Sequence, residues 1–241
     1  MEIRLVQTQK ELDAIYKFRY EIYVSEMGRK PENVCYEKAI IKEPLDQKAN
    51  IFAAIKEGRV LGTVRTNYTK FMDRRQFSSN YIHDLNYYID MYDISYFNEF
   101  FPEKTSFSTK MMVSTNLRSG VIAARLSVAT FNQASIDGIR YDFIDCNPPL
   151  IKMYEKMGYR ATPKGWFIHP QYGDVLSMFL DLEDFEYFKS IGSIFRRDPK
   201  KRKDRRKENI LNIPYPFKNK REGERRHVFN PNMDWRQFAQ N

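Results

Sequence analysis

The chain has 241 residues, of which 42% are hydrophobic and 29% are charged, and its formal net charge at pH 7 is +9. This composition describes one ordinary soluble domain with a sizeable core. No run of about 18 apolar residues occurs in it, so the sequence offers no helix that could span a membrane.

The N-terminal part of the chain predicts a strand, a helix and a hairpin, in that order. Residues 2–6 are the predicted strand. Residues 9–27 are the predicted helix, because their apolar side chains recur on one face. Residues 51–56 and 60–67 predict two strands joined by a Glu-Gly pair, which is typical of a tight turn.

The middle of the chain alternates strands and helices. Residues 107–115 predict a strand and residues 121–137 a helix. Residues 140–146 predict a buried strand, because they alternate and carry aromatic and β-branched groups. Another helix follows, and residues 166–182 predict a closing hairpin with its turn at 170–173.

The segment from residue 147 to residue 159 carries the strongest functional signal. Asn147 follows a predicted strand, and the two prolines after it suit a helix start, where the missing N–H is not needed. Tyr154 lies about two turns into the helix. Gly158 predicts a helix end in left-handed conformation. The alternative is an ordinary amphipathic helix with a glycine cap.

This segment resembles motif B of the GNAT acyltransferases, where an asparagine, a tyrosine and a glycine–aromatic pair recur at these spacings. The resemblance implies an α/β fold with a mixed, mostly antiparallel central sheet flanked by helices. It implies that Asn147 lends its side-chain amide to a phosphopantetheine arm. It also implies that Tyr154 is the catalytic acid, which protonates the departing thiolate.

The junction between the strand at 107–115 and the next helix resembles motif A of the same family. In that motif, backbone N–H groups at a helix N-terminus hold a pyrophosphate or phosphate. Val121 stands where the first motif glycine belongs, and Gly120 lies one place early. The resemblance implies that the acyl donor is bound by a run of consecutive residues, namely Arg118, Ser119, Gly120, Val121, Ile122 and Ala123.

Roughly residues 1–185 resemble the acyl-homoserine-lactone synthases and the long-chain N-acyl amino acid synthases. Three features are shared. The first is a helix that carries an arginine and an aromatic residue four places on, here Arg19 and Tyr23. The others are a Gly-x-x-Arg strand, here Gly62 to Arg65, and a polar–basic pair, here Thr109-Lys110. Lys110 replaces the usual arginine, and Phe107 stands where the lactone synthases carry a glutamate. The missing glutamate, together with a motif B that is better preserved than in most lactone synthases, favours a resemblance to the N-acyl amino acid synthases.

The resemblance implies an N-acyltransferase. It would move an acyl group, expected to be a long fatty acyl chain, from an acyl carrier protein or coenzyme A thioester to the amine of an amino acid or similar small amine. The thioester is a cosubstrate, and no permanently bound cofactor is expected. A backbone N–H near Met112 or Val113 should polarise the thioester carbonyl. Four charged residues should bind the acceptor: Arg19, Arg65, Lys110 and Asp46.

Several points stay open. The general base could be Glu43, Asp46 or a water chain. The aromatic-rich stretch 81–101 could wall an acyl tunnel or belong to the core. One alternative function is an acetyltransferase that uses acetyl-coenzyme A, which would need a short acyl pocket. Another is a non-catalytic protein that binds nucleic acid or a membrane surface through a basic arm.

The positive charge lies in one segment. Residues 1–195 carry 25 basic and 25 acidic side chains, whereas residues 196–226 carry 14 basic and 5 acidic ones. We expect an acyltransferase domain over residues 1–192 and a basic extension over residues 193–241, partly mobile or docked on the body. An acidic acyl carrier protein is its expected partner, with anionic lipid, nucleic acid or no specific partner as alternatives.

Cysteines and histidines are few. The chain has two cysteines, Cys35 and Cys146, and three histidines that share no metal-ligand spacing, so we expect no metal. The N-terminus is charged from residue 2 and lacks a signal-peptide core, and we expect reduced thiols in a cytoplasm. A small buried apolar residue explains Cys146 better than a nucleophile does.

Overall fold

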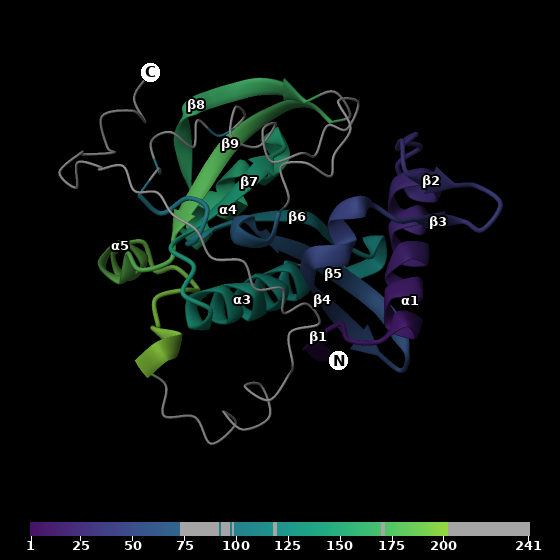
Figure 1. Cartoon of the computed structure of the whole chain (residues 1–241), viewed down its shortest axis with the longest axis horizontal. Helices are drawn as coiled ribbons and strands as arrows, with labels where there is room; N and C mark the ends of the chain where they lie inside the picture. The colour runs from purple at the N-terminus through teal and green to yellow at the C-terminus, as the bar shows by residue number, and fades with distance from the viewer. Residues whose placement is uncertain (73–91, 93–96, 98, 118–119, 170–171, 202–241) are drawn as a thin grey trace.

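The structure of the chain is a computed structural model, which describes residues 1–72, 92, 97, 99–117, 120–169 and 172–201 (Figure 1). Its centre is a seven-stranded sheet with the strand order β1-β4-β5-β6-β7-β9-β8. Neighbouring strands run antiparallel except β6 and β7, which run parallel. The strands are β1 (Glu2–Leu5), β4 (Ala49–Lys56), β5 (Arg59–Tyr68), β6 (Thr105–Val113), β7 (Tyr141–Cys146), β8 (Arg160–His169) and β9 (Gly173–Asp181).

Helices cover both faces of the sheet. Helix α1 (Gln9–Tyr20) lies on one face and α3 (Val121–Ile136) on the other, as Figure 1 shows. The alternation along β5 explains this arrangement, because Val64 packs on α3 while Arg65 points to the α1 side. Two shorter helices complete the described body, α4 (Ile151–Met157) and α5 (Phe185–Ser190). The mixed, mostly antiparallel sheet flanked by helices confirms the fold predicted from the sequence.

The sheet splits at the parallel pair of β6 and β7. Strand β6 pairs with β7 through Thr105–Phe107 alone, opposite Tyr141–Phe143, and the two strands separate beyond that point. A β-bulge lies in the separated part of β6, since Lys110 and Met111 together oppose one residue of β5. Lys110 has a φ of 54°, which is uncommon for a residue with a side chain. The split and the bulge leave backbone and side chains of β6 facing a gap.

Most predicted elements are present, with shifted ends. The predicted helix at 9–27 is α-helical to Tyr20 and continues as a π-helical turn over Glu21–Glu26. In that turn Met27 N–H donates to Ile22 O, five residues back, at 3.0 Å. A two-residue hairpin of β2 (Val34–Cys35) and β3 (Ile40–Ile41) was not predicted, because strands this short carry no periodicity.

Helix α4 begins and ends as its sequence predicts. A 3-10 turn at Pro148–Leu150 precedes it, so the two prolines stand where no N–H is needed. Gly158 ends the helix with a φ of 115°. A Cβ at this position would lie 2.6 Å from the Phe188 ring, so close packing as well as backbone conformation requires glycine.

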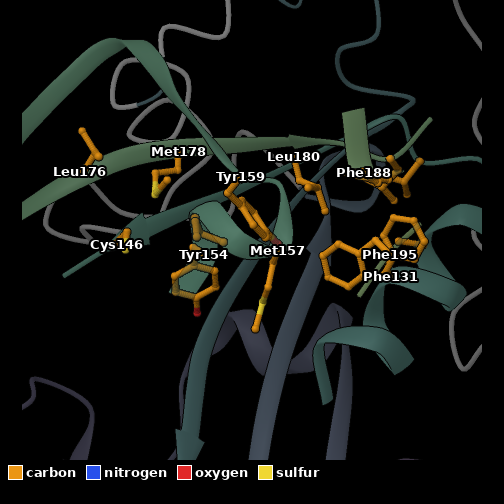
Figure 2. Close-up of a cluster of buried hydrophobic side chains, with 14 of the residues drawn as sticks. Phe131, Cys146, Tyr154, Met157, Tyr159, Leu176, Met178, Leu180, Phe188 and Phe195 are labelled. Carbon is orange, nitrogen blue, oxygen red and sulfur yellow. The ribbon is translucent and has the colours of Figure 1, made fainter. Parts of the chain in front are cut away.

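A hydrophobic cluster holds α4 between the sheet and the end of the described chain (Figure 2). Phe131 of α3 stacks on Phe195 with ring centroids 4.4 Å apart. Ser193 donates its hydroxyl to Met157 O at 2.5 Å, and Phe195 is buried. The chain just after residue 192 therefore packs on the body. Most of the basic stretch at 196–226 lies outside the described residues.

The described part of the stretch 81–101 belongs to a second hydrophobic cluster. Tyr92 and Phe97 are buried there and pack against Phe107 and Phe143. Phe107, which stands where the lactone synthases carry a glutamate, is thus a core residue in this chain. Residues 81–91 lie outside the described residues.

Candidate active site

A cleft opens where β6 and β7 separate. It encloses about 680 Å³, counted to its open mouth. Its walls come from β6, β7, the start of α4, the π-helical turn and the chain around the β8–β9 turn. Four residues predicted from the sequence line this cleft together: Arg65, Lys110, Asn147 and Tyr154.

A second, narrow cavity lies on the α3 side of the sheet. It shares Ser108, Met111, Ile144 and Tyr154 with the cleft, so the two spaces adjoin at the split between the strands. Its other walls are mostly apolar and come from β5, α3, β9 and the C-terminal segment, including Val64, Phe131, Ala134, Leu180, Leu182 and Phe195. A polar cleft and an apolar cavity therefore meet at Tyr154.

Tyr154 is buried and keeps its proton. Its ring packs edge-on against Tyr159 with centroids 5.2 Å apart. In Figure 2 its hydroxyl points away from Leu176 and Met178. Burial raises the pKa of the Tyr154 phenol well above its usual value. At neutral pH the phenol is therefore a proton donor, which is the state that the predicted acid role requires.

Asn147 links the start of α4 to the β8–β9 turn. Its side-chain amide donates to Tyr172 O at 3.5 Å, the long limit for a hydrogen bond. The residue lies between β7 and the 3-10 turn, with its own backbone extended. A contact this long can be exchanged for one to a ligand at little cost.

The predicted donor-binding loop leads into α3. Gly120 precedes the helix with a φ of 81°, and Val121 is 58% exposed. Ile122 and Ala123 are buried on the inner face of α3, so only their backbone could meet a ligand. Arg118 and Ser119 lie outside the described residues.

The two residues predicted to supply a backbone N–H to the thioester lie just past the bulge. The side chain of Met112 packs with Phe18 and Ile22 on the α1 side. Val113 packs toward α3 on the opposite side. Met111, which lies inside the bulge, is the residue of this stretch that lines the cleft.

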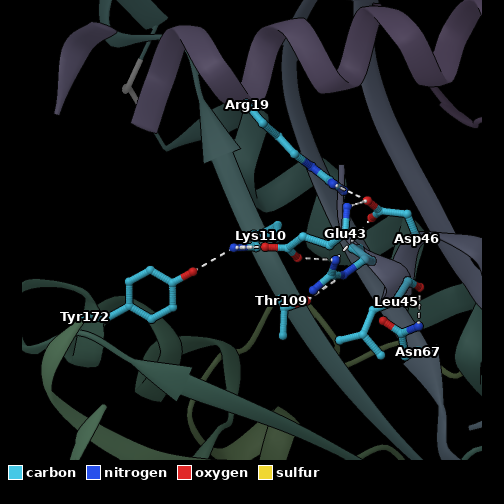
Figure 3. A network of polar contacts seen from close by, with 9 residues as sticks. Arg19, Glu43, Leu45, Asp46, Asn67, Thr109, Lys110 and Tyr172 are labelled. Atoms are coloured by element: carbon cyan, nitrogen blue, oxygen red, sulfur yellow. Dashed lines mark hydrogen bonds and ion pairs between the residues drawn. The ribbon is translucent and has the colours of Figure 1, made fainter. Parts of the chain in front are cut away.

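A buried network joins three of the predicted acceptor-binding residues to two carboxylates (Figure 3). Asp46 pairs with Arg19 at 2.8 Å and with Arg65 at 3.1 Å. Glu43 pairs with Arg65 at 2.5 Å and with Lys110 at 2.8 Å. The carboxylates are placed by the 3-10 turn Pro44–Lys48, in which Asp46 accepts from Glu43 N–H at 2.8 Å.

The network is a structural unit that reaches the cleft at one end. Arg19 and Asp46 are buried and do not line the cleft. Lys110 does line it and donates to the Tyr172 hydroxyl at 2.6 Å. Burial alone would raise the pKa of Asp46, but Arg19 and Arg65 hold it below its usual value. Burial alone would lower the pKa of Lys110, but the negative charge of Glu43 raises it above its usual value, so Lys110 stays charged.

Asp145 is a cleft residue that the sequence did not single out. It lies on β7, half-buried, and accepts a hydrogen bond from the Tyr92 hydroxyl. Burial raises the pKa of Asp145 to about 6. Alternation along β7 places Asp145 on the same strand face as Tyr141 and Phe143. The pattern that predicted this strand could therefore have indicated a carboxylate on the face that borders the cleft.

The far side of the cleft is aromatic. The ring of His169 stacks on Tyr172 at 4.3 Å between centroids. Burial, together with the charges of Lys110 and Arg29, lowers the pKa of His169 to about 4, so this imidazole is neutral at pH 7. The sequence missed both rings, because a single histidine and a tyrosine near a turn carry no motif.

Cys146 lies beside the cleft as a protonated thiol. It is buried, and burial raises its pKa to about 12. A thiolate is needed for nucleophilic attack, so these properties support the interpretation of Cys146 as a small buried residue. Among the described residues, no group of three histidine, cysteine or acidic side chains could hold a metal ion. None of the described helices has the length and apolar character to cross a membrane.

No family model and no curated protein matches this sequence. Solved structures with a similar fold include the CoA-dependent acyl-homoserine lactone synthase MesI, with a TM-score of 0.57, 20% identity, and coverage of 79% of this chain and 95% of that chain. The CoA-dependent acyl-homoserine lactone synthase BjaI with MTA gives a TM-score of 0.58, 14% identity, and coverage of 80% and 90%. FeeM, an N-acyl amino acid synthase from uncultured soil microbes, gives a TM-score of 0.57 and 13% identity, with coverage of 81% of this chain and 96% of that chain. These similarities confirm the fold.

Proposed function

We propose that the protein is an N-acyltransferase that moves an acyl group from a thioester to a small amine. One observation carries the proposal: the sheet splits between β6 and β7, and Tyr154 stands where a polar cleft adjoins an apolar cavity. A thioester needs both environments, since its acyl chain is apolar and its carbonyl must meet a polar acceptor. The fold shared with MesI, BjaI and FeeM, which are acyl-transferring synthases by their descriptions, supports the same class.

The donor would enter along the split. Backbone N–H groups at the N-terminus of α3, from Gly120 onward, would hold its phosphates, and Asn147 its pantetheine amide. The carrier is coenzyme A or an acyl carrier protein. The basic stretch at 196–226, with a net charge of +9, favours an acidic carrier protein as one source of the acyl group.

The chemistry would be direct transfer. Asp145 takes a proton from the acceptor ammonium, and the neutral amine attacks the thioester carbonyl, whose developing oxyanion meets a backbone N–H near Met112 or Val113. The C–N bond forms and the C–S bond breaks. Tyr154 gives its proton to the thiolate and recovers one from the new amide nitrogen. Glu43 and Asp46 are poorly suited to be the base, since ion pairs with buried cations occupy both.

Replacing Tyr154 by phenylalanine should lower kcat roughly 10- to 1000-fold, as expected for the loss of one positioned proton donor. The ring keeps its packing against Tyr159, so the melting temperature should barely change. The measurement is steady-state release of free thiol from an acyl-CoA. Tyr36→Phe is the control, because Tyr36 is 55% exposed and lines neither cavity. Unchanged turnover would remove Tyr154 from the mechanism.

We expect a donor with a long acyl chain, which would enter the narrow apolar cavity behind Tyr154. Each buried CH₂ contributes ~0.8 kcal/mol, so about four of them give a preference of roughly 200-fold over a short chain. We expect kcat/KM for myristoyl-CoA to exceed that for acetyl-CoA by at least this ratio. Ser127→Leu, which fills the cavity from α3, should shift the preference toward shorter chains, whereas Ser190→Leu on exposed α5 should not. A preference for acetyl-CoA would favour the acetyltransferase alternative.

A further inference from the structure

Arg29 stands at the wall of the cleft, directly after the π-helical turn. Its guanidinium lies over the ring of Tyr23, 5.4 Å from the centroid, and over the ring of Tyr172, 5.1 Å from the centroid. Its backbone N–H donates to Tyr23 O at 2.8 Å. Two stacked rings and a backbone hydrogen bond therefore hold this side chain in place before any ligand arrives.

Arg29 shares its two rings with Lys110, whose Nζ lies 4.9 Å from the centroid of Tyr23 and 5.4 Å from that of Tyr172, but it differs from the other cations of the site in its carboxylate partners. Each of Arg19, Arg65 and Lys110 forms an ion pair with Glu43 or Asp46. Within the part of the chain that the structure describes, no carboxylate pairs with Arg29. Its guanidinium lies over aromatic faces and lines the cleft, and the ring faces do not replace the carboxylate oxygens that its N–H donors can bind.

The sum of charges at the site also favours an anionic ligand. The buried network alone holds three cations and two carboxylates. Arg29 adds a fourth cation, and Asp145, which among the described residues is the one carboxylate that lines the cleft, adds a third anion. One positive charge remains in excess even with Asp145 ionised. A ligand that brings one negative charge would balance it.

We propose that Arg29 binds the carboxylate of the acceptor, and that the enzyme therefore acylates amino acids in preference to simple amines. This inference rests on the proposed acyl transfer. A guanidinium presents a planar fork of donors that matches a carboxylate with two parallel hydrogen bonds. The neutral imidazole of His169 stacks on the same ring of Tyr172 and adds no charge to the site.

The placement of Arg29 favours the acceptor over the phosphates of the donor. Tyr23 packs with Phe18 and Met112 on the α1 side of the sheet, and Lys110 reaches Glu43 on that side. The N-terminus of α3, which suits phosphates, belongs to the helix on the opposite side. Donor and acceptor would thus reach the split from opposite faces, with their reacting groups meeting at Tyr154.

The test compares acceptors that differ only by a carboxylate, such as phenylalanine with phenethylamine and leucine with isopentylamine, using one acyl-CoA as donor. The wild-type protein should prefer the amino acid by roughly 10- to 100-fold in kcat/KM, the ratio expected for charged hydrogen bonds. Arg29→Gln should abolish this preference through the acceptor KM and leave the donor KM unchanged. Arg29→Lys should keep part of it. Arg59→Gln, at an exposed site on β5, is the matched control.

Two outcomes would overturn the inference: a wild-type enzyme that acylates both members of each pair equally well, or an Arg29→Gln variant whose donor KM rises instead. The second would assign Arg29 to the phosphates of the donor. Calorimetry of the same pairs needs no turnover, so it separates the two proposals. Carboxylate-dependent binding that requires Arg29, without any transfer, would support Arg29 as the carboxylate-binding residue and contradict the acyltransferase function. Binding of neither member would contradict the inference.

Discussion

Replacing Asp145 by asparagine should lower turnover by about 100- to 10,000-fold, the range expected for loss of a general base. The asparagine keeps the size of the side chain and can still accept from the Tyr92 hydroxyl, so the fold should persist. A base works only when ionised. Because the pKa of Asp145 is raised to about 6, the wild-type rate should rise with pH through that value and fall as pH drops below it. The measurement is kcat/KM between pH 5 and 9.

A pH dependence near 6 can be assigned to Asp145 only if the other titratable groups near the reacting atoms do not titrate there. The pKa values of Lys110 and Tyr154 are raised, and that of His169 is lowered to about 4, so none of them should titrate near 6. Asp142, in the second cavity, also has a pKa raised to about 6 by burial, although three hydroxyl donors oppose the shift. Asp142→Asn is therefore the necessary control, and its kcat/KM should still rise with pH through about 6. If the same rise of kcat/KM with pH remains in Asp145→Asn, the general base is another group.

Replacing Asp46 by alanine should lower the free energy of unfolding by about 3–5 kcal/mol, because it leaves Arg19 and Arg65 buried without this carboxylate. The pKa of Asp46 is lowered in the folded state, so its contribution is present at neutral pH and is lost as pH falls through that lowered value. The variant should therefore lose part of the acid sensitivity of the wild-type protein. Urea unfolding at pH 7 and at several pH values below 3.8, the usual pKa of an aspartate carboxyl, measures both effects.

The matched control is Asp13→Ala on the exposed face of α1, where a loss within about 0.5 kcal/mol is expected. The opposite pattern would contradict a structural role. If Asp46→Ala unfolds at the same urea concentration as the wild-type protein but raises the acceptor KM, then Asp46 belongs to acceptor binding, as its position in the sequence alone suggested.

The sequence predicted the elements that carry local signals. Helix α4 was predicted from two prolines, a tyrosine and a glycine, and each of these acts over a few residues of chain. The hairpin of β4 and β5 turns at Glu57 and Gly58, both with positive φ, as its Glu-Gly pair indicates. These features depend on backbone preferences, which neighbouring residues reveal.

The chemistry of the site depends on contacts that no local pattern reveals. Arg19 pairs with Asp46, and Arg65 with Glu43, across long stretches of chain, so the sequence indicated charged residues but not that they neutralise one another. The bulge at Lys110 follows from the pairing of β6 with β5 and has no signature of its own. The sequence left open whether residues 81–101 wall an acyl tunnel or belong to the core; the described Tyr92 and Phe97 are core residues, and the apolar cavity beside the cleft is walled by α3, β9 and Phe195.

The most direct test of the proposed function is mass spectrometry of lipid extracts from a heterologous bacterial host that makes the protein, with a host that makes Asp145→Asn as the matched control. A new N-acyl amino acid should appear, with a long acyl chain, and its amount should fall sharply in the Asp145→Asn host. The product would name donor and acceptor together. If the folded protein accumulates without any new N-acylated compound, or if only acetylated amines appear, the long-chain N-acyltransferase function is contradicted.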